Sequence, residues 1–276
     1  MEEMIEFEQH VFNELKISFN KPIKDYSFAV DCMIRLPKYR PHSLDKAVSF
    51  CLVHLKDIGF KNELIKRASL DCPILIHRLF LIGALSCDDF AEWIVQCRHF
   101  ISYYYFKNEK LDFPHDLIKS GSEEIKRYGK NFDDYEVELL IKYGFLPTSI
   151  GFCLKYDDID NLEKLLYTKG DKREDSVIWS PFEWTKMPEK RDLLSFSAYF
   201  SSIRCFKLLL YNNYRINQDV IEAVVCSGSL DLFHLCVHDN LYPGLLISKA
   251  SEFSHLELIQ YLVEAYKIDI HTRVIF

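Results

Sequence analysis

The chain has 276 residues, of which 49% are hydrophobic and 14% aromatic, and a formal net charge of −7. This apolar content excludes a disordered chain, because it is enough to build a buried core. The negative charge argues against general binding of nucleic acid or anionic membranes, which both need a basic surface. The length suits two domains or one repeat array.

The sequence predicts that the N-terminal part of the chain is helical. Apolar residues recur at three- and four-residue intervals in most windows, and the whole chain has only nine glycines and nine prolines, which favours an all-α fold. The segment 1–6 is acidic where a secretory signal is basic, so no export is expected. The apolar window 79–85 is too short to span a bilayer, so we expect no membrane insertion. We predict an N-terminal helical region over residues 1–130.

The nine cysteines are scattered along the chain, and no pair has the two-residue gap that structural zinc sites favour. An odd number without a framework predicts reduced thiols and hence a cytoplasmic location. Most of these cysteines have apolar neighbours, which is typical of small buried hydrophobic residues.

A repeated pattern begins near Pro147. It aligns on four anchor residues, and the third, sixth and seventh positions after each anchor are apolar. The anchors are Ile159, Ile203, Leu230 and Leu256. A polar residue stands directly before each anchor: Asp158, Ser202, Ser229 and His255. The pattern therefore predicts that each unit forms a helix, a tight turn and a second helix. A further unit would place Asp134 at the anchor position.

An insert separates the first two units at about residues 167–190, where the anchors are 44 residues apart instead of 27 or 26. It carries the aromatic residues Trp179, Phe182 and Trp184. Such a cluster can anchor a partner if it is exposed. The alternative is that the insert folds back and covers the core of the repeats.

Several runs resemble the divergent ankyrin-repeat proteins that are expanded in parasitic protists, whose N-terminal region is a helical domain of unknown function. The runs are 192–207, 224–236 and 249–256, with further similar blocks at 153–159 and 180–184. The resemblance implies an α-solenoid with cytoplasmic binding activity, and it supplies no catalytic residues. The units are shorter than the roughly 33 residues of a standard ankyrin repeat, and the Thr-Pro-Leu-His turn of a typical unit is absent.

Motifs for catalysis or for cofactor binding were not found. The closest glycines are Gly144 and Gly151, too far apart for a phosphate-binding loop. His234 and His238 can share a helical face but lack an obvious third metal ligand, and histidines at a helix end are the simpler interpretation. Cys236 lies two residues from His234, so the two side chains point apart on a helix. We expect no catalytic residues, no cofactor and no metal.

These patterns predict an all-α fold, an elongated α-solenoid of divergent ankyrin-like hairpins at 131–276 that follows the helical region. Such arrays bind through loop tips and the exposed faces of first helices. The predicted partner-binding residues are Tyr199, Glu222 and Lys249 from first helices, Arg215, His238 and Tyr242 from loops, and Trp179 and Trp184 from the insert.

The function that we expect is a protein–protein interaction module, a cytoplasmic scaffold or adaptor without catalytic activity, whose partner is another protein. The alternative is a structural subunit of a larger cytoskeletal or organellar assembly. An enzyme ranks third.

Overall fold

The computed structural model describes residues 26–39, 43–97, 101–128, 132–168, 176–178, 180–183, 190–236, 243–253 and 255–267. This part of the chain contains sixteen helices and two short strands, so the predicted all-α class is confirmed.

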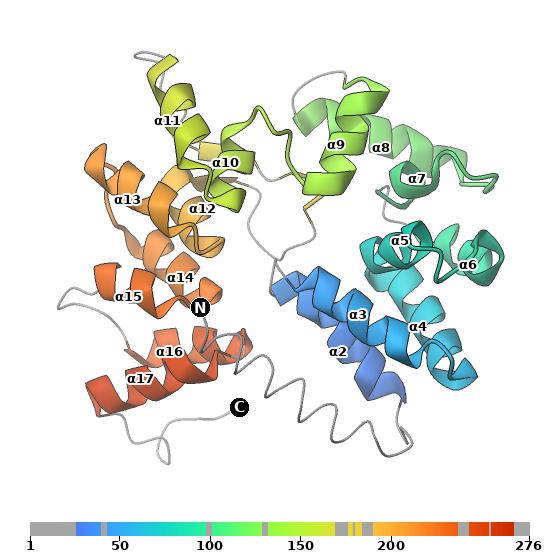
Figure 1. Cartoon of the computed structure of the whole chain (residues 1–276), viewed down its shortest axis with the longest axis horizontal. Coiled ribbons are helices and arrows are strands. Elements are labelled where there is room, and N and C mark those ends of the chain that lie inside the picture. The colour runs from blue at the N-terminus through green and yellow to red at the C-terminus, as the bar shows by residue number, and fades with distance from the viewer. Residues whose placement is uncertain are drawn as a thin grey trace.

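Eight of these helices form the N-terminal half (Figure 1). They are α2 (Tyr26–Tyr39), α3 (Leu44–His54), α4 (Ile58–Asp71), α5 (Pro73–Leu81), α6 (Cys87–Ile94), α7 (Ile101–Phe106), α8 (His115–Tyr128) and α9 (Asp134–Tyr143). They pack in two rows, because α4 lies between α2 and α6, while α5 lies between α3 and α7, and α9 packs on α7. The predicted helical region is thus itself layered. We call it the N-terminal stack.

The other eight helices and both strands form the C-terminal half. They are α10 (Ile150–Tyr156), α11 (Ile159–Thr168), β1 (Ser176–Ile178), β2 (Lys190–Asp192), α12 (Leu193–Tyr199), α13 (Ile203–Tyr211), α14 (Gln218–Ser227), α15 (Leu230–Cys236), α16 (Pro243–Glu252) and α17 (Leu256–Tyr266). We call this half the C-terminal stack.

The C-terminal helices pack as four consecutive pairs, α10–α11, α12–α13, α14–α15 and α16–α17. Each of the four anchor residues is the first residue of the second helix in its pair. The predicted helix–turn–helix register is therefore confirmed. Because each first helix also packs on the first helix of the next pair, the pairs stack in chain order.

The turn inside these pairs repeats. The residue two positions before the anchor has a left-handed backbone at Asp157, Ser201 and Gly228, with φ values of 54°, 55° and 73°. In two of the four units the polar residue directly before the anchor contacts the preceding pair. Ser202 donates from Oγ to the carbonyl of Leu154 in α10, and His255 Nε2 lies 2.8 Å from the carbonyl oxygen of Cys226 in α14. These contacts join neighbouring layers.

The regular stacking is interrupted between α9 and α10. One apolar core contains buried side chains from Ala29 to Leu140 together with Phe182 of the insert, and a second contains the others from Phe145 to Leu262. Because the side chains of α9 belong to the first core, the break between the cores falls later than the predicted boundary at residue 130. The chain turns at the break, so the two stacks lie side by side (Figure 1). The predicted elongated arrangement, in which they would continue in one line, is not observed.

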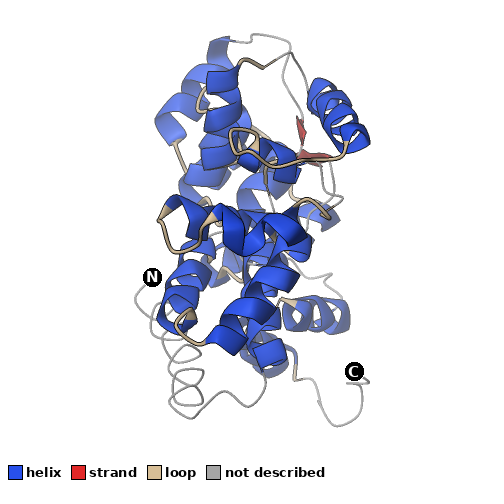
Figure 2. Cartoon of the chain, turned by 90° about the vertical axis from the view of Figure 1, so that its right-hand side faces the viewer, coloured by secondary structure: helices blue, strands red, loops and turns tan. Residues whose placement is uncertain are grey.

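The insert between α11 and α12 folds back onto the protein in its described part. β1 and β2 pair antiparallel, with Val177 opposite Arg191, and both strands pack against α12. Figure 2 shows these short strands among the surrounding helices. Val177 and Phe182 are buried. For Val177 the alternative in which the insert covers the core of the repeats is the observed one, whereas Phe182 is buried in the core of the N-terminal stack.

Candidate functional site

The first helices of the C-terminal stack form a continuous row. α10 packs on α12, α12 on α14, and α14 on α16. We call these four helices the first-helix row. In Figure 1, α12, α14 and α16 lie on the side of the C-terminal stack that faces the N-terminal stack.

Acidic and basic side chains are interspersed on this row. Lys249 on α16 donates from Nζ to Glu252 Oε2 at 2.8 Å. The hydrogen bond to Glu252 raises the pKa of Lys249, and the negative charge of Glu222 on the adjacent α14 contributes to the rise. Glu222 and Lys249 are both half-buried. The structure therefore brings these two predicted partner-binding residues close together on neighbouring helices.

A second pair of charges lies beside them. Arg191 Nη1 on β2 is 3.6 Å from Asp219 Oδ1 in the first turn of α14. The predicted residue Arg215 is exposed in the loop before α14. Ion pairs in contact with water contribute at most about 1 kcal/mol each to stability. The pair of Lys249 and Glu252, which are 35% and 38% exposed, therefore contributes little to folding. In the second pair Asp219 is 62% exposed, whereas the side chain of Arg191 is only 14% exposed.

The prediction that Tyr199 lies on an exposed helix face is wrong. Only 2% of Tyr199 is exposed, and every residue of α12 is buried. The physical reason is the number of neighbours around α12, since α10 and α14 flank it in the row, α13 pairs with it, and β1 and β2 cover it. Tyr199 is a core residue.

Four other predicted partner-binding residues lie outside the residues that the structure describes. They are Trp179, Trp184, His238 and Tyr242. Their assignment to a binding surface remains a prediction from the sequence.

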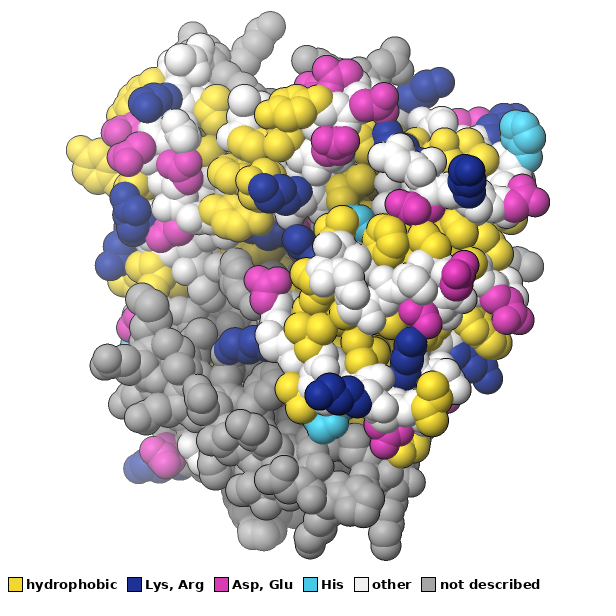
Figure 3. Space-filling model, turned by 45° about the vertical axis from the view of Figure 1, so that its right-hand side comes forward, with side chains coloured by type: hydrophobic (Ala, Val, Ile, Leu, Met, Phe, Trp, Pro, Cys, Tyr) yellow, Lys and Arg dark blue, Asp and Glu magenta, His cyan; other side chains and the backbone are white. Residues whose placement is uncertain are grey.

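The surface of the N-terminal stack has a mixed character. In Figure 3 apolar, acidic and basic side chains are interspersed over the described part of the face that is turned to the viewer. Large apolar residues on this stack include Val53, Ile58 and Leu81, each more than half exposed. Among the described residues visible there, charges of one sign do not gather into a patch.

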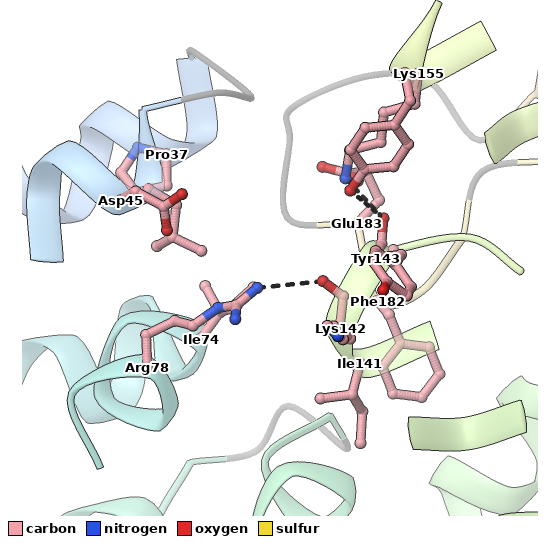
Figure 4. A pocket seen from close by; sticks show the side chains of 13 residues that line it. Pro37, Asp45, Ile74, Arg78, Ile141, Lys142, Tyr143, Lys155, Phe182 and Glu183 are labelled. Atoms are coloured by element: carbon pink, nitrogen blue, oxygen red, sulfur yellow. Dashed lines mark hydrogen bonds and ion pairs between the residues drawn. The ribbon is translucent and has the colours of Figure 1, made fainter. Parts of the chain in front are cut away.

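A cavity of about 320 Å³ lies where the two stacks meet (Figure 4). Its walls come from α2, α3 and α5 of the N-terminal stack, from α9 and α10 on either side of the break between the cores, and from the insert. Arg78, Lys142 and Lys155 provide basic groups, and Asp45 and Glu183 provide acidic ones. The lining therefore combines charged with apolar side chains, and it has one basic group more than it has acidic groups.

A buried ion pair lies on one side of this cavity. Lys155 Nζ on α10 is 2.5 Å from Glu183 Oε2 of the insert, and the side chains are only 11% and 6% exposed. Lys155 also donates to the carbonyl of Tyr143 at 2.9 Å. A buried charge is expensive unless it is paired and hydrogen-bonded. Each member of this pair therefore depends on the other.

The carbonyls at the end of α9 accept hydrogen bonds from both stacks. Arg78 on α5 donates from Nη2 to the carbonyl of Lys142 at 3.2 Å, and the hydroxyl of Tyr156 on α10 donates to that of Tyr143 at 3.2 Å. The last carbonyls of a helix lack partners within the helix, and basic side chains near them are favoured. Arg78 and Lys155, two of the three basic groups of the cavity, are thus already engaged by the protein.

Sequence reasoning missed the cavity and its ion pair. Arg78, Lys155 and Glu183 come from three separate segments, and none of them stands in a recognisable motif. The only local signal was an acidic residue, Glu183, between the aromatic residues of the insert.

Three buried cysteines of the C-terminal stack are poor nucleophiles. Burial raises the pKa of Cys153 to about 11 and that of Cys226 and Cys236 to about 12. These thiols therefore stay protonated at neutral pH, whereas the thiolate is the reactive form. The burial that was predicted from their apolar neighbours is confirmed for these three.

Two further observations concern the described residues alone. No three His, Cys, Asp or Glu side chains among them lie close enough together to hold a metal ion. None of the described helices is long and apolar enough to cross a membrane.

Comparison with known proteins gives no relative. No protein-family model, no curated protein and no solved structure matches the chain. The ankyrin-like resemblance and the function that it implies therefore rest on the sequence patterns.

Proposed function

We propose that this protein is a non-catalytic interaction module of ankyrin-like hairpins that binds another protein through the first-helix row. The observation that carries the proposal is the repetition of one unit in the C-terminal stack. Stacked hairpins of this kind create an extended surface in which each layer adds side chains at equivalent positions.

The charges on the row support the same proposal. Glu222 and Lys249 occupy adjacent layers and are only half-buried, and the ion pair of Lys249 with Glu252 contributes little to folding. Complementary charges across an interface raise the association rate and the specificity of a complex. The partner is accordingly a folded or extended protein segment with its own mixed charges, and the proposed location is the cytoplasm.

A charge-swap variant tests the proposal. Glu222→Lys combined with Lys249→Glu reverses the pattern on the row and leaves the net charge unchanged. The matched control is Lys207→Glu with Glu264→Lys, which exchanges exposed charges on the second helices α13 and α17. Both proteins and the wild type are used to capture partners, which are quantified by mass spectrometry.

We expect the row variant to lose partners that the wild type and the control both retain, with melting temperatures that agree among the three proteins. Equal capture by all three proteins would rule out the first-helix row as the binding surface.

A further inference from the structure

We infer that residues 180–183 form a clasp that sets the angle between the two stacks about a hinge at Gly144. The helices before and after this segment, α11 and α12, both belong to the C-terminal stack. The segment itself reaches into the N-terminal stack. It is therefore a loop of one stack that is anchored in the other.

Phe182 is the anchor of the clasp in the N-terminal stack. It is 2% exposed and belongs to the apolar core of that stack, whereas Val177, earlier in the same insert, belongs to the other core. The ring of Phe182 meets that of Tyr104 edge to face, with centroids 5.9 Å apart. The fully buried Ser180 shapes the turn, since its carbonyl accepts from the amide of Glu183 at 3.0 Å.

Glu183 ties the same segment to the C-terminal stack through its buried ion pair with Lys155. Neighbouring residues of the insert thus hold opposite sides of the junction, with Phe182 in one core and Glu183 bound to α10. In Figure 4 the side chains of Lys155 and Glu183 point toward one another and are joined by a dashed line.

Gly144 is suited to be the hinge. It has φ of 81°, a backbone conformation that side chains other than glycine resist. A Cβ atom at this position would collide with Glu183 Oε2 and approach Lys155 Nζ to 3.0 Å. The hinge and the ion pair of the clasp are therefore packed directly against each other.

The packing at the junction permits a change in the angle between the two stacks. The helix pairs that pack most closely all lie within one stack, and a cavity of about 320 Å³ fills part of the junction. A fully packed interface would resist a change of angle, because protein interiors rearrange between discrete packings. Here a few contacts fix the angle, so that their removal releases it.

A distance measurement between the stacks tests this inference in the full chain. Nitroxide labels are attached through a non-natural amino acid at Leu81 in the N-terminal stack and Tyr211 in the C-terminal stack, which are 59% and 83% exposed. Such labels leave the nine cysteines untouched. Pulsed electron paramagnetic resonance then gives the distribution of distances between the labels.

We expect Glu183→Gln and, independently, Phe182→Leu to shift the mean distance and broaden its distribution. The control is Lys61→Met, which removes the 2.7 Å ion pair with Asp89 inside the N-terminal stack and should leave the distribution unchanged. Phe182→Leu keeps an apolar anchor, so it provides a folded variant even if loss of the buried pair unfolds the protein. Wild-type distributions in the clasp variants would overturn the inference, as would equal changes in the control.

Discussion

His77 is a buried neutral histidine in the N-terminal stack. Its ring is stacked on that of Tyr105 with centroids 4.7 Å apart, and burial, assisted by the charge of Arg78, lowers its pKa from 6.5 to about 4. Between these values the unfolded chain binds a proton that the folded protein does not. The contribution of His77 to stability is therefore complete above pH 6.5 and is lost as the pH falls toward 4.

We expect the free energy of unfolding to decrease by about 2 kcal/mol between pH 7 and pH 5 because of this one group. His77→Phe keeps a ring against Tyr105 but cannot titrate. Between pH 7 and pH 5 the free energy of unfolding of this variant should therefore decrease by about 2 kcal/mol less than that of the wild type. Urea titrations of both proteins at the two pH values measure the difference. Parallel pH profiles would show that His77 is protonated in the folded protein.

Tyr199 shows the limit of sequence reasoning for single residues. It stands on a first helix at a position that the general architecture of repeats leaves exposed. The sequence contained no sign that β1 and β2 would cover α12, because strands of three residues are too short to have a recognisable pattern.

Tyr199→Ala should destabilise the protein by roughly 3 to 5 kcal/mol, as is typical for removal of a large buried ring. Phe206→Ala and Phe233→Ala, also core residues, should cost a similar amount. Tyr211→Ala removes an 83% exposed ring and should change stability by less than about 0.5 kcal/mol. Chemical denaturation measures all four. A small loss for Tyr199→Ala would place that ring at the surface.

At the scale of the helical elements, the repeat was the most predictable feature. The four anchors recur with a defined apolar pattern, and each proved to start a second helix. The layering of the N-terminal stack was not predicted, although α3, α5 and α7 begin at regular intervals, at Leu44, Pro73 and Ile101. At the start of α6, Ser86 is the capping residue, and its amide donates to Asp89 Oδ2 at 2.8 Å, so that Ser86 and Asp89 form a capping box.

The turn glycine Gly228 offers a test of the contacts between layers. Its φ is 73°, and a Cβ atom there would collide with the ring of His255, which contacts the carbonyl of Cys226. Gly83 has a similar φ of 72° but open space around it. Gly83→Ala should therefore cost about 1 kcal/mol, the strain of a left-handed backbone.

Gly228→Ala should cost at least about 1 kcal/mol more than Gly83→Ala, because it also displaces a hydrogen-bonding side chain. Thermal unfolding of the two variants gives the comparison. Equal losses would mean that the contact of His255 with the preceding pair contributes nothing to stability.

At the scale of the whole molecule, the side-by-side arrangement of the stacks could not be read from the sequence. The contacts that define it join residues far apart in the chain, such as Tyr104 of the N-terminal stack and Phe182 of the insert. Neither the apolar periodicity nor the repeat spacing contains information about such pairs. The arrangement bears on the proposed function because it places the first-helix row opposite the N-terminal stack (Figure 1).

Binding of a partner through the first-helix row is the central claim, and site-specific photocrosslinking tests it most directly. A photoreactive amino acid replaces Glu222 on the row in one protein and the exposed Lys207 on α13 in another. Both are expressed in cells, irradiated and examined for crosslinked products. We predict partner crosslinks from position 222 and few or none from position 207. Crosslinks from position 207 without any from position 222 would contradict the claim.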